Sequence, residues 1–167
     1  YANAESFYLK GLKKDSKMNY ALLNLSSLYN VVGKNDASLQ VLQKALKNDP
    51  NNERIYYNLA LLYNEMNNTV AAEASFAKAV ALKSQNPRVY YNYGLMLNAK
   101  KKTKEAEKNK KKGIAINPDT PDLYYALTFV YIQTGNQLKA QQTAFRLKQL
   151  DPNNPNYQEL FKNLGLQ

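Results

Sequence analysis

The chain has 167 residues and a formal charge of +10, with neither cysteine nor histidine. The missing residue types exclude disulfides, Cys/His metal sites and acid–base chemistry by histidine. Hydrophobic residues make up 44% of the chain, enough for the core of one domain, and no apolar run is long enough to span a membrane.

One phrase returns every 34 residues: "RIYYNLALLYN" begins at Arg54, "RVYYNYGLMLN" at Arg88 and "DLYYALTFVYI" at Asp122. A fixed period of this length is typical of a solenoid built from repeated supersecondary units. The period divides the chain into a half unit at 1–18, full units at 19–52, 53–86, 87–120 and 121–154, and a closing segment at 155–167. We therefore expect a single repeat domain over 1–167.

The half unit resembles only the second part of a full unit, and we expect one helix over 3–14. Its apolar stripe, which includes Ala4, Phe7, Tyr8 and Leu12, would be partly uncovered because no first helix precedes it. The chain also begins at Tyr1 without a methionine, so we expect it to be a fragment of a longer protein.

Each full unit is predicted to form two helices. In its first half, apolar residues recur at the i, i+3, i+4, i+7 spacing of one helical face. The four sets are Leu22, Leu25, Ser26, Tyr29; Tyr56, Leu59, Ala60, Tyr63; Tyr90, Tyr93, Gly94, Leu97; and Tyr124, Leu127, Thr128, Tyr131. The third member is always small, which would let two helices approach closely.

A turn should follow each first helix, and three of the four turns contain Gly or Asn, which tolerate a left-handed backbone. The turn at 100–102 is Lys-Lys-Lys, so we expect it to be looser. In the second helix of the same unit, Lys110 occupies the position of Phe76, and Gly113 that of Ala79. We expect Lys110 to lay its stem along the core with its charge outward, and this helix to be the weakest.

The closing segment should form a terminal helix with Leu160, Phe161 and Leu164 directed inward. No unit shows the alternation of a β-strand, so the fold class is all-α. The pattern of Tyr56, Leu59, Ala60, Tyr63, Ala72, Phe76 and Ala79 resembles the tetratricopeptide repeat. That resemblance implies a right-handed superhelical solenoid of antiparallel helix pairs, with the first helices along a concave face and 155–167 as a capping helix.

The resemblance also implies which residues face a ligand in the concave groove. These are Asn24, Asn58, Asn92, Asn30, Asn64, Asn98, Tyr57, Tyr91, Tyr125, Arg54, Arg88 and Phe129. A primary amide both donates and accepts hydrogen bonds, so the two asparagine rows could hold the backbone of an extended peptide. Alternatively, these asparagines are solvated or support packing between helices.

The groove should be graded along its length. The fourth unit keeps Tyr125 but has Ala126, Phe129 and Ile132 where earlier units are more polar. This apolar end would take a hydrophobic side chain or be covered by the terminal helix. The lysine-containing clamp with which some members of the family hold acidic C-terminal tails is absent.

Most of the positive charge lies in the unit 87–120, which has nine basic and three acidic residues. The basic segment comprises Lys100, Lys101, Lys102, Lys104, Lys108, Lys110, Lys111 and Lys112. A lysine-rich helix is typically a solvated face, and without interleaved aromatic residues nucleic acid is disfavoured as a ligand. Attachment to an anionic surface through this segment remains an alternative.

No nucleophile–base pair, phosphate loop or metal-spaced cluster is present, so we expect neither an enzyme nor a cofactor. The sequence favours a scaffold that binds a protein or peptide. Self-association through the exposed N-terminal half unit is an alternative. The composition, rich in Asn, Lys and Tyr, is that expected of a soluble domain from a bacterium with an AT-rich genome.

Overall fold

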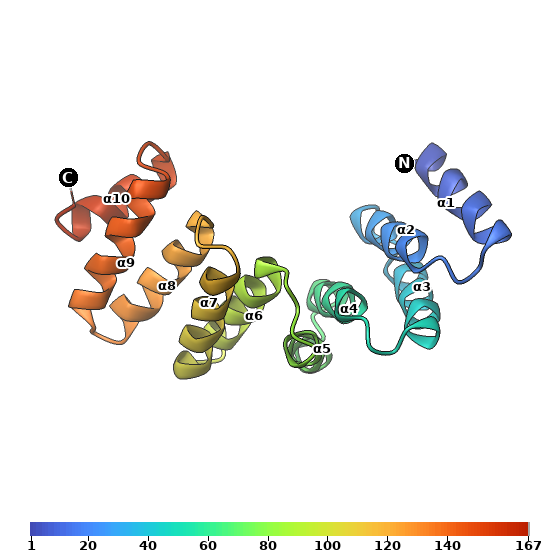
Figure 1. Ribbon diagram of the computed structural model, residues 1–167, viewed down its shortest axis with the longest axis horizontal. Helices are drawn as coiled ribbons and strands as arrows, with labels where there is room; N and C mark the ends of the chain where they lie inside the picture. Colours follow the sequence, from blue (N-terminus) through green and yellow to red (C-terminus); the bar gives the residue numbers. More distant parts are fainter. Residues whose placement is uncertain (167) are drawn as a thin grey trace. The chain divides into compact units, whose positions relative to one another are not determined.

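The computed structural model describes residues 1–166, and every regular element among them is an α-helix (Figure 1). The all-α prediction is therefore confirmed. The chain divides into two compact units, the first covering 1–84 and the second 85–167. No helix in the described part of the chain is long and apolar enough to cross a membrane.

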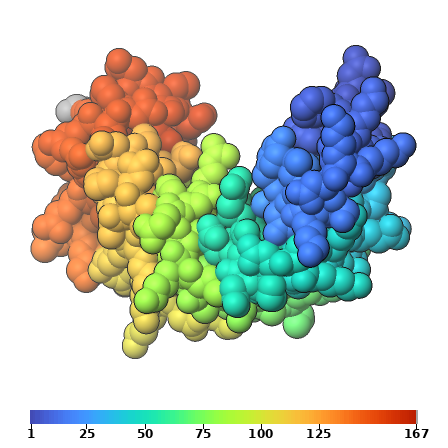
Figure 2. Space-filling model, turned by 45° about the vertical axis from the view of Figure 1, so that its right-hand side comes forward, coloured from blue at the N-terminus to red at the C-terminus, as the bar shows by residue number. Residues whose placement is uncertain are grey.

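The first unit contains five helices joined by short turns. They are α1 (Ala2–Lys14), α2 (Asn19–Val31), α3 (Asn35–Asn48), α4 (Glu53–Glu65) and α5 (Thr69–Ala81). Helix α2 pairs with α3, and α4 pairs with α5. Helix α1 packs against α2, and none of its residues is buried; the side chain of Phe7 is 66% exposed. Figure 2 shows α1 (dark blue) beside α2 with its outer side uncovered. The uncovered stripe is as predicted.

The second unit contains the other five helices. They are α6 (Pro87–Ala99), α7 (Thr103–Ile116), α8 (Pro121–Gln133), α9 (Gln137–Leu150) and α10 (Pro155–Asn163). Helix α6 pairs with α7 and α8 with α9, while contacts of α8 with both α6 and α7 join the two pairs. Helix α10 packs on α9.

Asparagine side chains cap several helices. Asn52, Asn86 and Asn154 each accept a hydrogen bond from the backbone N–H two residues later, at the starts of α4, α6 and α10. Asn68 and Asn136 accept from the backbone three residues later, at the starts of α5 and α9. A capping oxygen of this kind satisfies one of the backbone donors that a helix N-terminus leaves unpaired, so these linkers define where each helix begins.

The lysine turn at 100–102 is as tight as the glycine turn at its equivalent place, so the looser turn we expected is wrong. Lys101 adopts a left-handed backbone with φ 59°, and Gly135 has φ 69°. In both turns the left-handed residue donates its N–H to the carbonyl three residues before it, at 2.9 Å for Lys101 and 3.1 Å for Gly135. The hydrogen bonds of the turn therefore outweigh the steric cost of a side chain there.

The third position of each full repeat is also fully buried. Ala21, Ile55, Val89 and Leu123 are all at most 1% exposed. They lie one residue before the stripe that the sequence periodicity indicated. Within that stripe Tyr90 is buried, whereas Tyr56 and Tyr124 are half-buried. The buried face of the first helix therefore extends one residue beyond the predicted stripe, and Leu123 lies there against Gly113 of the preceding second helix.

The prediction that Lys110 directs its charge outward is wrong. Its side chain is only 1% exposed, and Nζ donates a 2.7 Å hydrogen bond to the backbone carbonyl of Gly94 on α6. A Cβ at Gly94 would lie 2.9 Å from Cγ and 3.1 Å from Nζ of Lys110. The missing side chain of Gly94 therefore provides the space that the buried lysine occupies.

The packing of α7 against its neighbours also requires a glycine at position 113. A Cβ at this position would lie 2.9 Å from both δ-carbons of Leu123 and 3.2 Å from Cβ of Tyr90. The glycine thus lets α7 lie close to both α6 and α8. Helix α7 runs unbroken from Thr103 to Ile116 through it. Whether α7 is the weakest helix stays a prediction.

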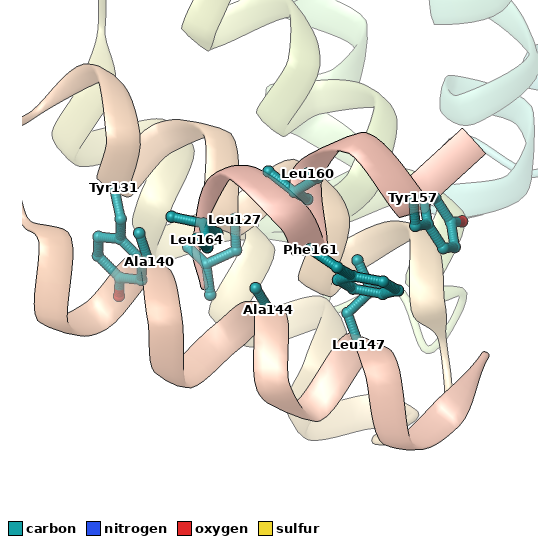
Figure 3. Packing of buried hydrophobic residues seen from close by; sticks show 9 residues of the cluster. All are labelled: Leu127, Tyr131, Ala140, Ala144, Leu147, Tyr157, Leu160, Phe161 and Leu164. Atoms are coloured by element: carbon teal, nitrogen blue, oxygen red, sulfur yellow. The ribbon is translucent and has the colours of Figure 1, made fainter. Parts of the chain in front are cut away.

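The C-terminal end of the second unit has its own hydrophobic cluster, shared by α8, α9 and α10 (Figure 3). Leu160, Phe161 and Leu164 contact it from the terminal helix and are buried, as predicted. Small residues of α9, Ala140 and Ala144, are fully buried and leave room for these larger side chains.

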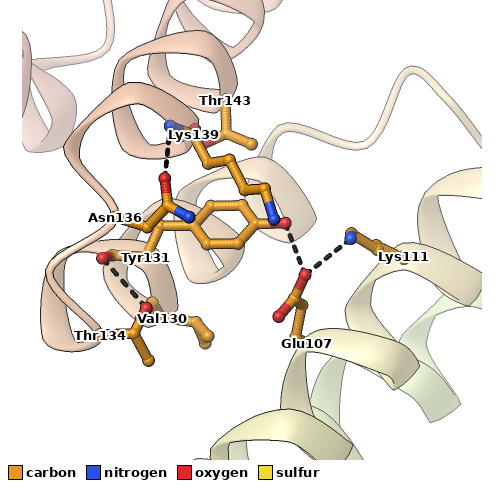
Figure 4. A network of polar contacts seen from close by, with 8 residues as sticks. All are labelled: Glu107, Lys111, Val130, Tyr131, Thr134, Asn136, Lys139 and Thr143. Atoms are coloured by element: carbon orange, nitrogen blue, oxygen red, sulfur yellow. Dashed lines mark hydrogen bonds and ion pairs between the residues drawn. The ribbon is translucent and has the colours of Figure 1, made fainter.

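A carboxylate–tyrosine hydrogen bond recurs in equivalent places of the two units. Glu107 Oε1 on α7 accepts from the Tyr131 hydroxyl at 2.9 Å and from Lys111 Nζ at 2.6 Å (Figure 4). In the first unit Glu5 on α1 accepts from the Tyr29 hydroxyl, also at 2.9 Å. Both pairs are separated by 24 residues, so each joins a second helix, or α1, to the first helix of the next pair.

The fit between Gly94 and Lys110 can be tested by a double-mutant cycle. Glycine to alanine in a helix ordinarily stabilises by roughly 0.5–1 kcal/mol. We expect Gly94→Ala instead to lower the free energy of unfolding by about 1–3 kcal/mol, because the new Cβ overlaps Lys110. In a Lys110→Ala background the same change should cost much less, with a coupling energy of about 1 kcal/mol or more in urea unfolding. Additive effects would show that the two residues do not share this space.

Candidate functional site

The predicted groove asparagines do not form uniform rows. In the first row Asn24 is exposed, while Asn58 and Asn92 are half-buried. In the second row Asn64 is exposed, while Asn30 and Asn98 are half-buried, and the Oδ1 atoms of these two are buried without a hydrogen-bond partner in the described chain. The residues therefore differ in how much of each amide a ligand could reach.

The two units divide the predicted groove residues between them. The first unit holds Asn24, Asn30, Arg54, Tyr57, Asn58 and Asn64, and the second holds Arg88, Tyr91, Asn92, Asn98, Tyr125 and Phe129. Arg54 and Arg88 are exposed in the first turns of α4 and α6. The ring of Tyr57 packs against Phe76 at a centroid distance of 6.2 Å. One groove continuous along all four repeats stays a prediction.

The second unit contains a hollow between α8 and the terminal helix, with a volume of about 490 Å³. From here on it is called the C-terminal hollow. Tyr125, Phe129 and Ile132 form one wall, because their i, i+4, i+7 spacing puts them on one face of α8. Leu160 of α10 and Leu164, the residue that follows this helix, form the opposite wall. Phe129 and Ile132 remain 39% exposed, so the terminal helix borders this apolar face without covering it.

Polar residues surround the C-terminal hollow. They are Gln137 at the start of α9 and Asn156, Glu159 and Asn163 on α10. Apolar walls with a few polar groups at the edge are typical of sites that bind a side chain of a partner. The sequence pointed to Phe129 and Ile132, but the α10 residues could not be found without knowing how the terminal helix packs.

A second hollow of about 610 Å³ lies next to the first. It is lined by Tyr91, Asp122, Tyr125, Pro155, Asn156, Tyr157 and Glu159, and is called here the tyrosine–carboxylate cleft. The Tyr157 hydroxyl donates to Asp122 Oδ1 at 3.2 Å. Burial, followed by the charge of Asp122, raises the pKa of Tyr157 to about 12, and the same two causes lead the rise in the pKa of Tyr91. Tyr157 was not among the predicted site residues, whereas Tyr91 and Tyr125 were.

The first unit has a hollow of about 410 Å³ between α1 and α2, lined mainly by apolar and aromatic side chains. Phe7, Tyr8 and Met18 contribute to it, together with Tyr20 of α2. Phe7 and Tyr20 are exposed. This N-terminal hollow is a consequence of the uncovered stripe on α1.

The basic segment is smaller than its sequence suggests. Lys110 is buried and does not belong to the surface, which corrects its place in the predicted patch. Lys111 is paired with Glu107. The other six lysines, at 100, 101, 102, 104, 108 and 112, are exposed. Across the described residues no group of His, Cys, Asp and Glu is arranged to hold a metal ion.

Three segments match the sequence patterns of known repeat families. Residues 28–67 match a TPR repeat, and residues 53–86 and 97–164 each match a tetratricopeptide repeat pattern. The chain belongs to the tetratricopeptide repeat family. No curated protein matches it in sequence.

Several solved structures share the fold. YrrB, described as a TPR protein with an unusual peptide-binding site, is 19% identical with a TM-score of 0.80, covering 95% of this chain and 80% of its own. The type IV pilus biogenesis factor PilW is 21% identical with a TM-score of 0.81, covering 99% and 79%. MamA from Desulfovibrio magneticus RS-1 is 16% identical with a TM-score of 0.74, covering 92% and 87%. At these identities the likeness concerns the fold alone.

The buried lysine of the basic segment predicts an unusual pH dependence of stability. Burial lowers the pKa of Lys110 from 10.5 to about 8. Between these values the unfolded chain binds more protons than the folded chain, so raising the pH favours folding. We expect the free energy of unfolding of the native chain, relative to a Lys110→Met variant, to rise between about pH 8 and pH 10.

Urea unfolding at a series of pH values would measure this difference. Lys112→Met is the matched control, since it removes an exposed lysine of the same helix. A pH-independent difference for Lys110→Met would mean that the ammonium is not held in the interior.

Proposed function

We propose that the chain is a non-catalytic scaffold that binds an extended segment of a partner protein, with its main contact at the C-terminal hollow. The observation that carries this proposal is the apolar wall formed by Tyr125, Phe129 and Ile132, which stays accessible beside α10. A hollow of about 490 Å³ can accommodate one or two large apolar side chains. Membership of the tetratricopeptide repeat family and the peptide-binding site ascribed to YrrB support the same class of function.

Each unit has its own predicted groove residues, and those of the second unit belong to this proposal as secondary contacts. In the second unit, Asn92 contributes a half-buried amide and Tyr91 a half-buried ring. Asn30 and Asn98 fit the alternative role better, because their buried oxygens lie away from solvent. The secondary contacts would orient the bound segment, and the C-terminal hollow would contribute most of the binding free energy.

We also propose that α1 occupies the place of a second helix in a repeat. The Glu5–Tyr29 hydrogen bond has the same sequence separation and the same 2.9 Å length as the Glu107–Tyr131 bond between α7 and α8. The exposed Phe7 and the N-terminal hollow then favour a second candidate function, in which this end packs against another copy of the chain.

The proposal is tested by selecting binders from a random peptide library displayed on phage and measuring their affinity for variants. We expect Phe129→Ser to weaken the selected peptides by about tenfold or more, because an apolar anchor in such a hollow is worth 1.4 kcal/mol or more. Phe7→Ser is the matched control: it removes an exposed phenylalanine of the other unit and should leave the affinity unchanged.

Two other outcomes would change the conclusion. Affinity lost with Phe7→Ser and retained with Phe129→Ser would move the site to the N-terminal hollow. A native mass that rises with concentration, and that Phe7→Ser returns to the monomer, would favour self-association instead.

A further inference from the structure

The two hollows of the second unit adjoin one another. Tyr125, Asn156 and Glu159 line both the C-terminal hollow and the tyrosine–carboxylate cleft. An extended segment that places one side chain in the first hollow therefore has its neighbouring side chains beside the second. The chemistry of the cleft then decides which neighbours are favourable.

Three tyrosine rings form the aromatic part of the cleft. Tyr125 and Tyr157 lie 4.8 Å apart between ring centroids with their planes tilted by 37°, and Tyr91 contributes from α6. Tyr157 is buried and is held by its hydrogen bond to Asp122, so its ring cannot easily move away. The face of an aromatic ring is electrostatically negative and attracts a cation placed over it.

The charges that line the cleft have the same sign. Asp122 and Glu159 are its two ionisable carboxylates, both exposed, and the described lining includes no lysine or arginine. The nearest basic residue along α6 is Arg88, which is exposed in the first turn of that helix and is not part of the lining. Burial first, and then the charge of Asp122, raise the pKa of Tyr91 and of Tyr157.

We propose that the tyrosine–carboxylate cleft binds a lysine or arginine side chain of the partner segment, next to the apolar side chain that enters the C-terminal hollow. This inference rests on the proposed function and specifies its ligand as a segment with a basic residue beside a large apolar one. The aromatic faces contribute cation–π attraction, and Asp122 and Glu159 contribute ion pairing.

The charge of the cleft is opposite in sign to the net charge of the whole chain. A formal charge of +10 would by itself favour an acidic partner. Positive charge elsewhere on the surface repels a basic segment, so such a segment gains only where the carboxylates and rings surround it. The lysines of α7 attract an acidic peptide and repel a basic one. A preference for a basic peptide therefore distinguishes binding at the cleft from non-specific attraction to these lysines.

Three blocked pentapeptides that differ at a single residue test this inference. Each has a central leucine preceded by lysine, glutamine or glutamate and is otherwise glycine. Each is titrated into the ¹⁵N-labelled chain while amide chemical shifts are followed by NMR. We expect the lysine peptide to bind about tenfold more tightly than the glutamate peptide, with the glutamine peptide between them and the largest shifts on α8 and α10.

Variants of the chain test whether the preference for the lysine peptide arises at the cleft. Asp122→Asn keeps an oxygen that can accept from Tyr157 and removes the charge, and Glu159→Gln does the same on α10 without touching that hydrogen bond. Each should reduce the lysine preference several-fold. Glu105→Gln, which removes an exposed carboxylate of α7 outside the cleft, should leave the preference unchanged.

The outcomes separate this inference from the proposed function. Equal affinities for the three peptides, with shifts still confined to α8 and α10, would overturn the basic-residue preference and leave the scaffold proposal intact. Tighter binding of the glutamate peptide would also overturn the preference. The absence of shifts on α8 and α10 with every peptide would overturn both.

Discussion

The close approach of each first helix to its own second helix is the contact on which the rest of the structure depends. It is made at one small residue per repeat: Ser26, Ala60, Gly94 and Thr128. These positions lie 16 residues before Leu42, Phe76, Lys110 and Ala144 on the second helices. Gly94 is paired in this way with the long side chain of Lys110, and the bulkier Thr128 is paired with Ala144. At Gly94 the small residue provides the space for the long side chain of Lys110, while α6 and α7 stay paired.

Polar groups within these contacts are satisfied by the facing helix. Ser38 donates from Oγ to the carbonyl of Ser26 at 2.9 Å, and Thr128 Oγ1 bonds to Thr143 Oγ1 at 2.9 Å. The charged amine of Lys110 is satisfied in the same way, because it donates a hydrogen bond to the carbonyl of Gly94 on the facing helix. Buried polar groups are tolerated when they are hydrogen-bonded, which explains how one repeat accommodates an ammonium where another has a phenylalanine.

The helical spacing and the 34-residue period of the sequence predicted the helices and the uncovered stripe on α1, and the family resemblance implied how the helices pair. It could not predict that Lys110 points inward, since this requires the space left by Gly94 on another helix. It also misjudged the turn at Lys101, where backbone hydrogen bonds outweigh the intrinsic preference of the residue. Local pattern thus specifies the repeat, whereas tertiary contacts decide its exceptions.

In the candidate site too, the local sequence pattern predicted some residues, and others became evident only from tertiary contacts. Phe129 and Ile132 could be singled out because they break the polar pattern of the earlier repeats. The hollow they line is completed by Leu160 of the terminal helix and by Leu164 just after it. Tyr157 resembled an ordinary residue of that helix until its contact with Asp122 placed it in the cleft. The asparagine rows were predicted from the family resemblance and from their repetition, and neither distinguishes accessible Asn24 from Asn30 with its buried oxygen.

The central claim is that a partner segment places an apolar side chain between α8 and α10. Intermolecular nuclear Overhauser effects between a bound peptide and methyl-labelled protein test it most directly. We predict contacts from the peptide to the methyl groups of Ile132, Leu160 and Leu164. Contacts confined to exposed methyl groups outside the hollow, such as those of Val70 on α5 or Leu138 on α9, would contradict the account.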